Sequence, residues 1–235
     1  MIAPSHLASH HWPCAKPPVV MQKNNSEIVI RTLVTEIKNY LTRFNDSHMA
    51  TVLEGLNRWA RGPVGPVQGR THSVCAHLDT ALQTLGRTSL ATAINDARPF
   101  LSWVSYDAYP RDEIGARFAD NHAFASIIGE GCAIEAEDFD LGLFLIAPNL
   151  FYRDHRHAAP ELYAPLTGPH GWRFKPGDPL VWKNAHEPVW NRAWQPHATM
   201  TGDIPFLSIF CWTKDIALPA KIIPSSDWPT LENAS

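Results

Sequence analysis

From about residue 114 onward, the chain consists of short runs rich in β-branched and aromatic residues, separated by glycine, proline, asparagine and aspartate. The runs cover residues 124–128, 132–136, 142–147, 180–182, 188–190 and 206–212. Strands this short and this closely spaced favour an antiparallel barrel or sandwich over alternating strand–helix–strand units. This half of the chain is therefore expected to be a β-structure with a single interior.

The residues before about 100 follow a different period. Apolar residues recur at helical spacing, which predicts helices over about 26–44, 47–60, 74–85 and 89–97, with Ser26 as the cap of the first. Gly62 and Pro63 end the second helix. The N-terminal part should therefore form a helical layer beside the β-structure.

Three regions follow from these patterns. Residues 1–25 are rich in proline and histidine without periodicity, so we expect a tail on the surface. Residues 26–110 are expected to be a helical region packing on a barrel formed by residues 111–235. The length of 235 residues suits one well-buried core with such an accessory layer.

Charge and hydropathy exclude several partners. The formal net charge is -3, so nothing attracts the chain as a whole to nucleic acid or to an anionic membrane. The N-terminus has no basic segment followed by an apolar run, and the longest apolar stretch, 141–150, is too short to span a bilayer. Four cysteines lie far apart without a C-x-x-C pair, which favours reduced thiols. We expect a cytoplasmic protein that binds neither nucleic acid nor membrane.

A cluster of possible metal ligands lies in one short segment. His155 and His157 are two residues apart, so on a strand they share a face, and so do Glu161 and Tyr163 on the next strand. Residues 158–160 can turn the chain between them. Two neighbouring strands would then aim imidazole, carboxylate and phenol groups into one cavity. Such a set suits one divalent transition metal ion, either zinc, iron, manganese, cobalt or nickel, although a hydrogen-bonded surface patch is the alternative.

The same segment resembles the first cupin motif, H-x-H-x3-E-x6-G. Gly168 stands at the expected distance after Glu161, while Asn149 replaces the glycine that usually precedes the histidines. Two tyrosines, Tyr152 and Tyr163, extend the pattern to Y-x2-H-x-H-x3-E-x-Y. This extended motif is similar to that of the dimethylsulfoniopropionate (DMSP) lyases of the cupin superfamily and their lyase-like relatives.

A second resemblance lies downstream, at residues 196–198, 201, 205–207 and 211–213. In that family one histidine of this region completes the metal site and a tryptophan lines the pocket, which would be His197 and Trp212 here. His186 also lies on a stretch that could be a strand, so it stays open as the last ligand. The two motifs together cover roughly residues 140–215.

The resemblance implies a fold, a ligand set and a reaction. The fold would be mainly β, a cupin-type antiparallel β-barrel (double-stranded β-helix or jelly roll) with the N-terminal helical layer. The metal would be held by His155, His157, Glu161 and His197. The reaction would be β-elimination of DMSP, a small-molecule substrate, to dimethyl sulfide and acrylate.

Roles for the remaining residues follow from what this elimination requires. A base must take the proton beside the substrate carboxylate, and Tyr163 is the candidate because a nearby divalent ion favours its anion. Tyr152 would orient the carboxylate or share that role. The leaving sulfonium is a soft cation that aromatic faces attract, which indicates Trp212 and, with less support, Trp194 for substrate binding.

Two other functions stay open. A lyase-like cupin could act on another small carboxylate or on a sugar, as an isomerase or dioxygenase. A non-enzymatic, ligand-sensing cupin is the other, although residues 26–97 contain no recognisable DNA-binding helix-turn-helix. The paired tyrosines favour the lyase, because a dioxygenase has no need of them. A homodimer is compatible with the sequence.

Overall fold

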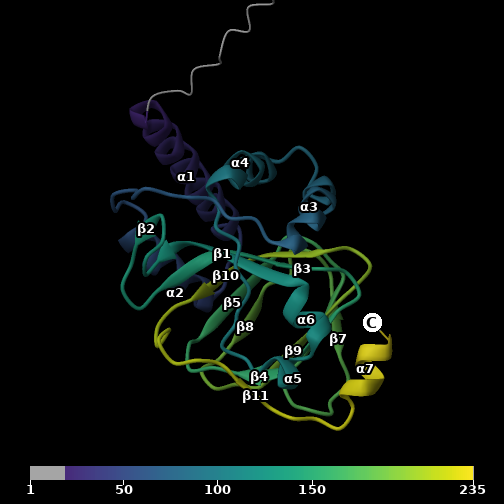
Figure 1. The fold of residues 1–235 in the computed structure, drawn as a ribbon. Coiled ribbons are helices and arrows are strands. Elements are labelled where there is room, and N and C mark those ends of the chain that lie inside the picture. The colour runs from purple at the N-terminus through teal and green to yellow at the C-terminus, as the bar shows by residue number, and fades with distance from the viewer. Residues whose placement is uncertain (1–18, 235) are drawn as a thin grey trace, which may run out of the picture.

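The computed structural model describes residues 19–234, which form a β-barrel with a layer of helices against it (Figure 1). The N-terminal helices are α1 (Val19–Leu41), α2 (Ser47–Trp59), η1 (Ser73–His77), α3 (Leu78–Thr84), α4 (Ser89–Ala97) and η2 (Arg98–Phe100). Three more are α5 (Arg111–Ile114), α6 (Ala116–Asp120) and α7 (Trp228–Ala234). Among the described residues, no helix has the length and apolar character needed to cross a membrane.

The predicted helices occur with two corrections. Helix α1 begins at Val19, so Ser26 lies inside it rather than at its cap, and residues 19–25 are helical instead of a tail. The rest of the predicted tail lies outside the described residues. The third predicted helix is a 3-10 turn, η1, followed by a short α3. The His72 side chain caps η1 by accepting from the backbone N–H of Val74.

The strands form two sheets. The strands are β1 (His122–Gly129), β2 (Ile134–Glu135), β3 (Asp140–Ile146), β4 (Phe151–Arg156), β5 (Glu161–Pro165), β6 (His170–Arg173), β7 (Val181–Lys183), β8 (Val189–Asn191), β9 (His197–Thr201), β10 (Phe206–Trp212) and β11 (Lys221–Ile222). Their orders are β2-β1-β3-β10-β5-β8 and β11-β4-β9-β6-β7. All named pairs are antiparallel except β1 with β2, which confirms the predicted antiparallel barrel.

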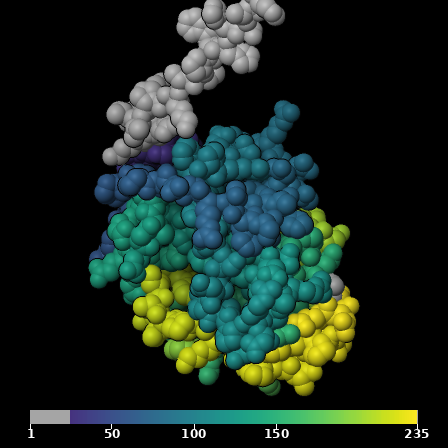
Figure 2. All heavy atoms as spheres, viewed as in Figure 1, coloured from purple at the N-terminus to yellow at the C-terminus, as the bar shows by residue number. Residues whose placement is uncertain are grey.

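The helical layer covers one wall of the barrel. In Figure 1 helices α1, α3 and α4 lie over the sheet that contains β1, β3 and β10. Leu143 and Ile209 pair directly across β3 and β10, and both belong to the same buried cluster as Ile37 of α1 and Ile94 of α4. Because these helices cover its outer face, the sheet can be apolar on that face while its inner face holds polar groups. In Figure 2 the helical segments form one continuous surface with the barrel.

The prediction that the two halves of the ligand segment lie on neighbouring strands is wrong. Strand β4 belongs to the five-stranded sheet and β5 to the six-stranded sheet. Residues 157–160 therefore carry the chain from one sheet to the other. The ligand candidates of β4 and β5 approach one another from two sheets, not along one.

Strand β4 contains a bulge that turns Tyr152 and His155 to the same side. Tyr152 pairs with Thr199 and His155 pairs with His197, so β4 has one residue more than β9 in this interval. Strict alternation would place Tyr152 and His155 on opposite faces. Instead their rings stack with centroids 4.0 Å apart.

A buried ion-pair network fixes the bulge from outside. The Arg173 Nε–H donates to Asp154 Oδ1 at 2.9 Å, and the same guanidinium donates to Asp227 Oδ1 at 3.0 Å. The indole N–H of Trp228 donates to Asp154 Oδ2 at 2.7 Å, which ties α7 to β4. Asp154 and Arg173 are both buried.

Asp154→Ala should therefore lower the free energy of unfolding by about 3 kcal/mol, because it removes the buried one of the two carboxylates that pair with Arg173 and leaves only Asp227, which is partly exposed. Chemical denaturation at neutral pH measures this change. Lys214→Ala is the matched control, because it breaks an ion pair with Asp215 whose partners are mostly exposed and should change stability little. A similar effect of both variants would contradict the structural role of the network.

Candidate metal centre

Three histidines converge inside the barrel from two paired strands. His155 lies near the end of β4, His157 follows that strand directly, and His197 opens β9. Their ligand atoms all lie within 4.8 Å of one another, and all three residues are buried. Because His155 and His197 are register partners, the pairing of β4 with β9 holds two of the rings side by side.

Each of the three rings has its tautomer fixed in the same way. The Nδ1 atoms of His155, His157 and His197 lie 2.8, 2.7 and 2.9 Å from the backbone oxygens of Arg153, Ala159 and Gln195. A carbonyl oxygen can only accept, so each Nδ1 carries the proton and donates it. Each Nε2 is therefore left with a lone pair, which is the arrangement of metal-binding histidines.

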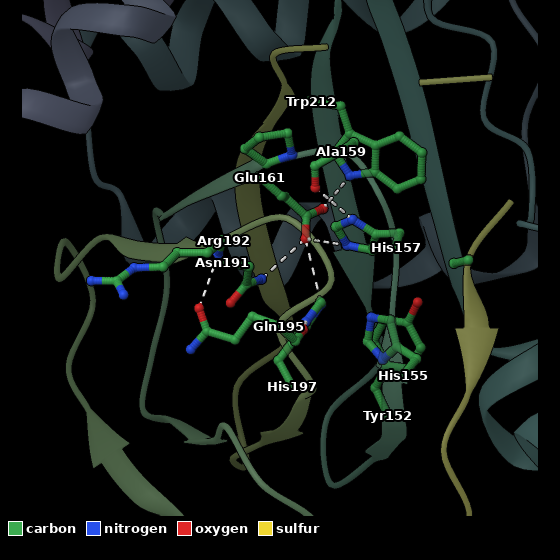
Figure 3. A network of polar contacts seen from close by, with 12 residues as sticks. Tyr152, His155, His157, Ala159, Glu161, Asn191, Arg192, Gln195, His197 and Trp212 are labelled. Carbon is green, nitrogen blue, oxygen red and sulfur yellow. Dashed lines mark hydrogen bonds and ion pairs between the residues drawn. The ribbon is translucent and has the colours of Figure 1, made fainter. Parts of the chain in front are cut away.

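Glu161 approaches two of the three histidines from the opposite sheet, as Figure 3 shows. Its Oε2 atom lies 3.1 Å from Nε2 of His157 and 3.6 Å from Nε2 of His197. Two donors hold the carboxylate in place. The indole N–H of Trp212 donates to Oε1 at 2.7 Å, and the Asn191 amide donates to Oε2 at 3.1 Å.

The donor set fits a divalent transition metal ion. Nε2 of His197 is buried and has no hydrogen-bond partner. With Nδ1 protonated, the Nε2 lone pairs of His157 and His197 face the Glu161 carboxylate. Hydrogen-bond acceptors therefore lie opposite one another with no donor between them. Leaving such groups unpaired in the interior is costly, and a cation among them would satisfy all of them at once.

The electrostatic environment keeps these groups in the forms that bind metal. Burial lowers the pKa of His155 to about 3 and that of His197 well below its usual value, so both rings are neutral at physiological pH. Burial alone would raise the pKa of Glu161. The hydrogen bond that the Trp212 N–H donates to Oε1 acts against burial and favours the ionised carboxylate.

A cavity of about 80 Å³ reaches the cluster at Glu161. Tyr152, Tyr163 and Trp212 line it, as do Tyr106, His122, Phe124, Asp140, Phe144 and Phe210. Burial, followed by the negative charge of Glu161, raises the pKa of Tyr163 well above 10.0. Burial likewise raises the pKa of Tyr152. Both phenols are thus neutral donors in the metal-free protein.

Two further sequence candidates lie elsewhere. The side chain of Trp194 is 42% exposed and does not line the cavity. Its backbone turns here with a φ of 60°, and its backbone N–H donates to the His157 carbonyl. His186 lies at a turn, where its Nδ1 contacts the Tyr40 hydroxyl at 2.9 Å. Of the two possible last ligands, the structure brings His197 and not His186 to the cluster.

Several residues of the site were not foreseen. The Tyr109 hydroxyl lies 2.9 Å from the Tyr152 hydroxyl, and it comes from the segment before α5 that carries no motif. Asn191 pairs in register with Glu161. The sequence offered one signal for Asn191, its position two residues after Val189 on the predicted strand. Residues two apart on a strand face the same side, so both could point inward.

A double-stranded β-helix whose interior gathers histidines and a glutamate in this way is a cupin-type barrel, so the predicted fold class is confirmed. The model of the dimethylsulfoniopropionate lyase family matches residues 49–208. The chain therefore belongs to the dimethylsulfoniopropionate lyase family.

A curated relative agrees with this assignment. Dimethylsulfoniopropionate lyase DddQ of Ruegeria pomeroyi is 30% identical over 116 residues, which are 46% of this chain and 53% of that protein. The chain thus matches about half the length of this relative.

Solved structures show the shared fold. The crystal structure of DMSP lyase DddQ from Ruegeria pomeroyi superposes with a TM-score of 0.60 at 21% identity, covering 83% of this chain and 96% of that one. A chain from the crystal structures of DMSP lyases RdDddP and RnDddQII superposes with a TM-score of 0.59 at 16% identity. The superposition covers 85% of this chain and 100% of that one.

Proposed function

We propose that this protein is a metal-dependent carbon–sulfur lyase that splits DMSP into dimethyl sulfide and acrylate by β-elimination. The observation that carries the proposal is the position of two buried tyrosines in a cavity that ends at the carboxylate of a three-histidine cluster. Membership of the DMSP lyase family supports it. The substrate class, a small zwitterion, suits the small size of the cavity.

We propose His155, His157, Glu161 and His197 as the ligands of one divalent transition metal ion. When bound, such an ion supplies a Lewis acid that withdraws charge from a substrate carboxylate and so acidifies the adjacent C–H bond. Ligands of nitrogen and oxygen accept zinc, iron, manganese, cobalt or nickel. The Nδ1–H bonds to backbone carbonyls would keep each imidazole oriented for this role.

We propose Tyr163 as the base. It lies two residues after Glu161 on β5, so alternation puts both side chains on the inner face of the barrel. Both line the same cavity, which brings the phenol close to the place where a substrate carboxylate would be held. Positive charge near this phenol would oppose the effect of burial and favour the phenolate.

Tyr152 is assigned to orienting the substrate carboxylate. Its ring is fixed between Phe118 and His155, at centroid distances of 4.0 Å to each. Its hydroxyl meets the Tyr109 hydroxyl at 2.9 Å. A side chain held on three sides in this way can position a substrate group precisely.

The function is tested by incubating metal-loaded protein with DMSP and measuring dimethyl sulfide in the headspace together with acrylate in solution. Equal molar amounts of the two products are expected. Protein stripped of metal by a chelator should release neither, and metal added back should restore release. Metal-loaded, folded protein that forms no acrylate from DMSP would contradict the proposal.

Trp212→Phe should weaken metal binding by about 10–100-fold, since it removes the N–H that orients Glu161 but keeps an aromatic ring. The ring also stacks on His157, with centroids 4.6 Å apart. Competition with a chromogenic chelator measures the affinity. Trp190→Phe is the matched control, because Trp190 stacks on His48 of α2 and does not line the cavity. Equal metal affinity of both variants would remove Trp212 as a positioning residue.

A further inference from the structure

A second carboxylate lies in the same cross-strand row as Glu161. Trp212 of β10 pairs on one side with Glu161 of β5 and on the other side with Asp140 of β3. Residues directly opposite in neighbouring strands place their side chains on the same face. Two strand spacings separate Asp140 from Glu161, which is roughly 10 Å between their backbones. Trp212 thus stands between a proposed metal ligand and a carboxylate that has no place in the metal cluster.

Asp140 lies at the boundary of two cavities. It lines the cavity beside Glu161 and also a second cavity of about 440 Å³, and Phe124 is the other residue that lines both. The larger cavity lies where the helical layer meets the barrel, with Ile30 of α1 and Val104 among its lining residues. The Asp140 carboxylate therefore stands between this outer space and the proposed reaction site.

Within the described part of the chain, Asp140 has a hydroxyl neighbour but no cationic side chain that pairs with it. Its Oδ1 atom is buried and has no hydrogen-bond partner. No lysine or arginine lines either cavity. Burial raises the pKa of Asp140 to about 6, the Ser126 hydroxyl acts against this, and the charge of Glu161 adds to it. A carboxylate in such a setting is stabilised most by a cation that arrives with a ligand.

Aromatic rings surround the space beside Asp140. Phe124 and Phe210 meet edge to face with centroids 6.0 Å apart, and Tyr106 and Trp212 do so at 6.5 Å. All four line the cavity that Asp140 shares with Glu161. Faces of aromatic rings attract organic cations whose charge is spread over methyl groups, as in sulfonium and quaternary ammonium groups.

We propose that Asp140 is the specificity-determining residue that recognises the cationic end of the substrate, so that the site selects short zwitterions with an onium group and a carboxylate. The carboxylate of such a molecule would lie toward Glu161 and the cluster, and its onium group toward Asp140 across the ring of Trp212. This assignment deepens the proposed function and rests on it for the orientation of the substrate. Neutral and purely anionic carboxylates would lack the second contact.

The test compares the binding of two probes of equal shape to metal-loaded protein by calorimetry. One is 3-(trimethylammonio)propanoate, which carries the onium charge, and the other is 4,4-dimethylpentanoate, which replaces the charged nitrogen by carbon. The unsubstituted protein should prefer the onium probe by about tenfold or more. Asp140→Asn should remove most of this preference while leaving the affinity for the uncharged probe unchanged.

Glu130→Gln is the matched control. Glu130 is exposed and lines only the outer cavity, so this variant removes one negative charge nearby without touching the boundary. It should keep the preference for the onium probe. Unchanged metal content and thermal unfolding temperature of Asp140→Asn show that the variant is folded.

Equal affinities of the unsubstituted protein for both probes, or an equal loss of both in Asp140→Asn, would overturn the assignment. Because the readout is binding, it is separate from the lyase reaction. A protein that releases no dimethyl sulfide but loses onium preference in Asp140→Asn would contradict the proposed reaction and support the role of Asp140. Release of dimethyl sulfide with an unchanged preference for the onium probe in Asp140→Asn would support the proposed reaction and contradict the role of Asp140.

Discussion

Replacing Tyr163 by phenylalanine should lower kcat for dimethyl sulfide release by about 10²–10⁴-fold, the range that a positioned general base contributes. The phenol lines the cavity beside Glu161, but it is not one of the proposed ligands. The variant should therefore keep its metal and its fold while losing the group that accepts the proton. Initial rates with DMSP at saturating concentration, with metal content measured on the same samples, give this result.

Tyr40→Phe serves as the control for loss of a buried phenol. Its hydroxyl contacts the Pro165 carbonyl and His186, away from the cavity, so the variant should keep its turnover. Tyr152→Phe distinguishes the two tyrosines of the site. A large loss of kcat in Tyr152→Phe with turnover retained in Tyr163→Phe would assign the base to Tyr152 instead.

Replacing His197 by alanine should weaken metal binding by at least about 100-fold, since loss of an orienting neighbour alone costs 10–100-fold. His197 joins the cluster from β9, and its Nε2 is buried without a hydrogen-bond partner. Dimethyl sulfide release should fall in parallel. Equilibrium dialysis followed by elemental analysis measures the bound metal.

His186→Ala is the comparison that the sequence itself suggests, because both histidines were candidates for the last ligand. His186 contacts Tyr40 at a turn and lies apart from the cluster. This variant should therefore bind metal as the unsubstituted protein does. Loss of metal in His186→Ala with retention in His197→Ala would mean that the site is built differently.

Much of the fold could be predicted because the two halves of the chain differ in period. Helical spacing before residue 100 and short strands after residue 114 gave the helical layer and the barrel. The start of α1 was missed because Ser26 has the chemistry of a cap although the helix already begins at Val19. Local preference for a cap is weak beside the packing of a long helix.

The candidate site was partly predictable from spacing. Residues two apart on a strand share a face, so the grouping of His155 with His157 and of Glu161 with Tyr163 needed no knowledge of the fold. That β4 and β5 belong to different sheets did not follow, because a four-residue connection can form either a hairpin or a crossing between sheets. The shared direction of Tyr152 and His155 depends on a bulge, which strand alternation cannot reveal.

Contacts between distant segments were beyond the sequence. Tyr109 contacts Tyr152 from a stretch without regular structure. Asp140 lies in the same cross-strand row as Glu161 because of the register in which β10 pairs with β3 and with β5. Trp194 shows the opposite case, a tryptophan near His197 in sequence whose turn directs the side chain to the surface. Long-range pairing decides the positions of Tyr109 and Asp140, and a local turn decides that of Trp194. Residue types alone specify neither.

The proposed reaction depends on one divalent metal ion bound among the imidazoles of His155, His157 and His197 and the carboxylate of Glu161. Diffraction data from crystals of metal-loaded protein, collected on both sides of the absorption edge of the metal, test it directly. We expect one strong anomalous peak, about 2.0–2.2 Å from the three Nε2 atoms and from an oxygen of Glu161. A strong peak at His186 or at another position, with none inside the barrel, would contradict it.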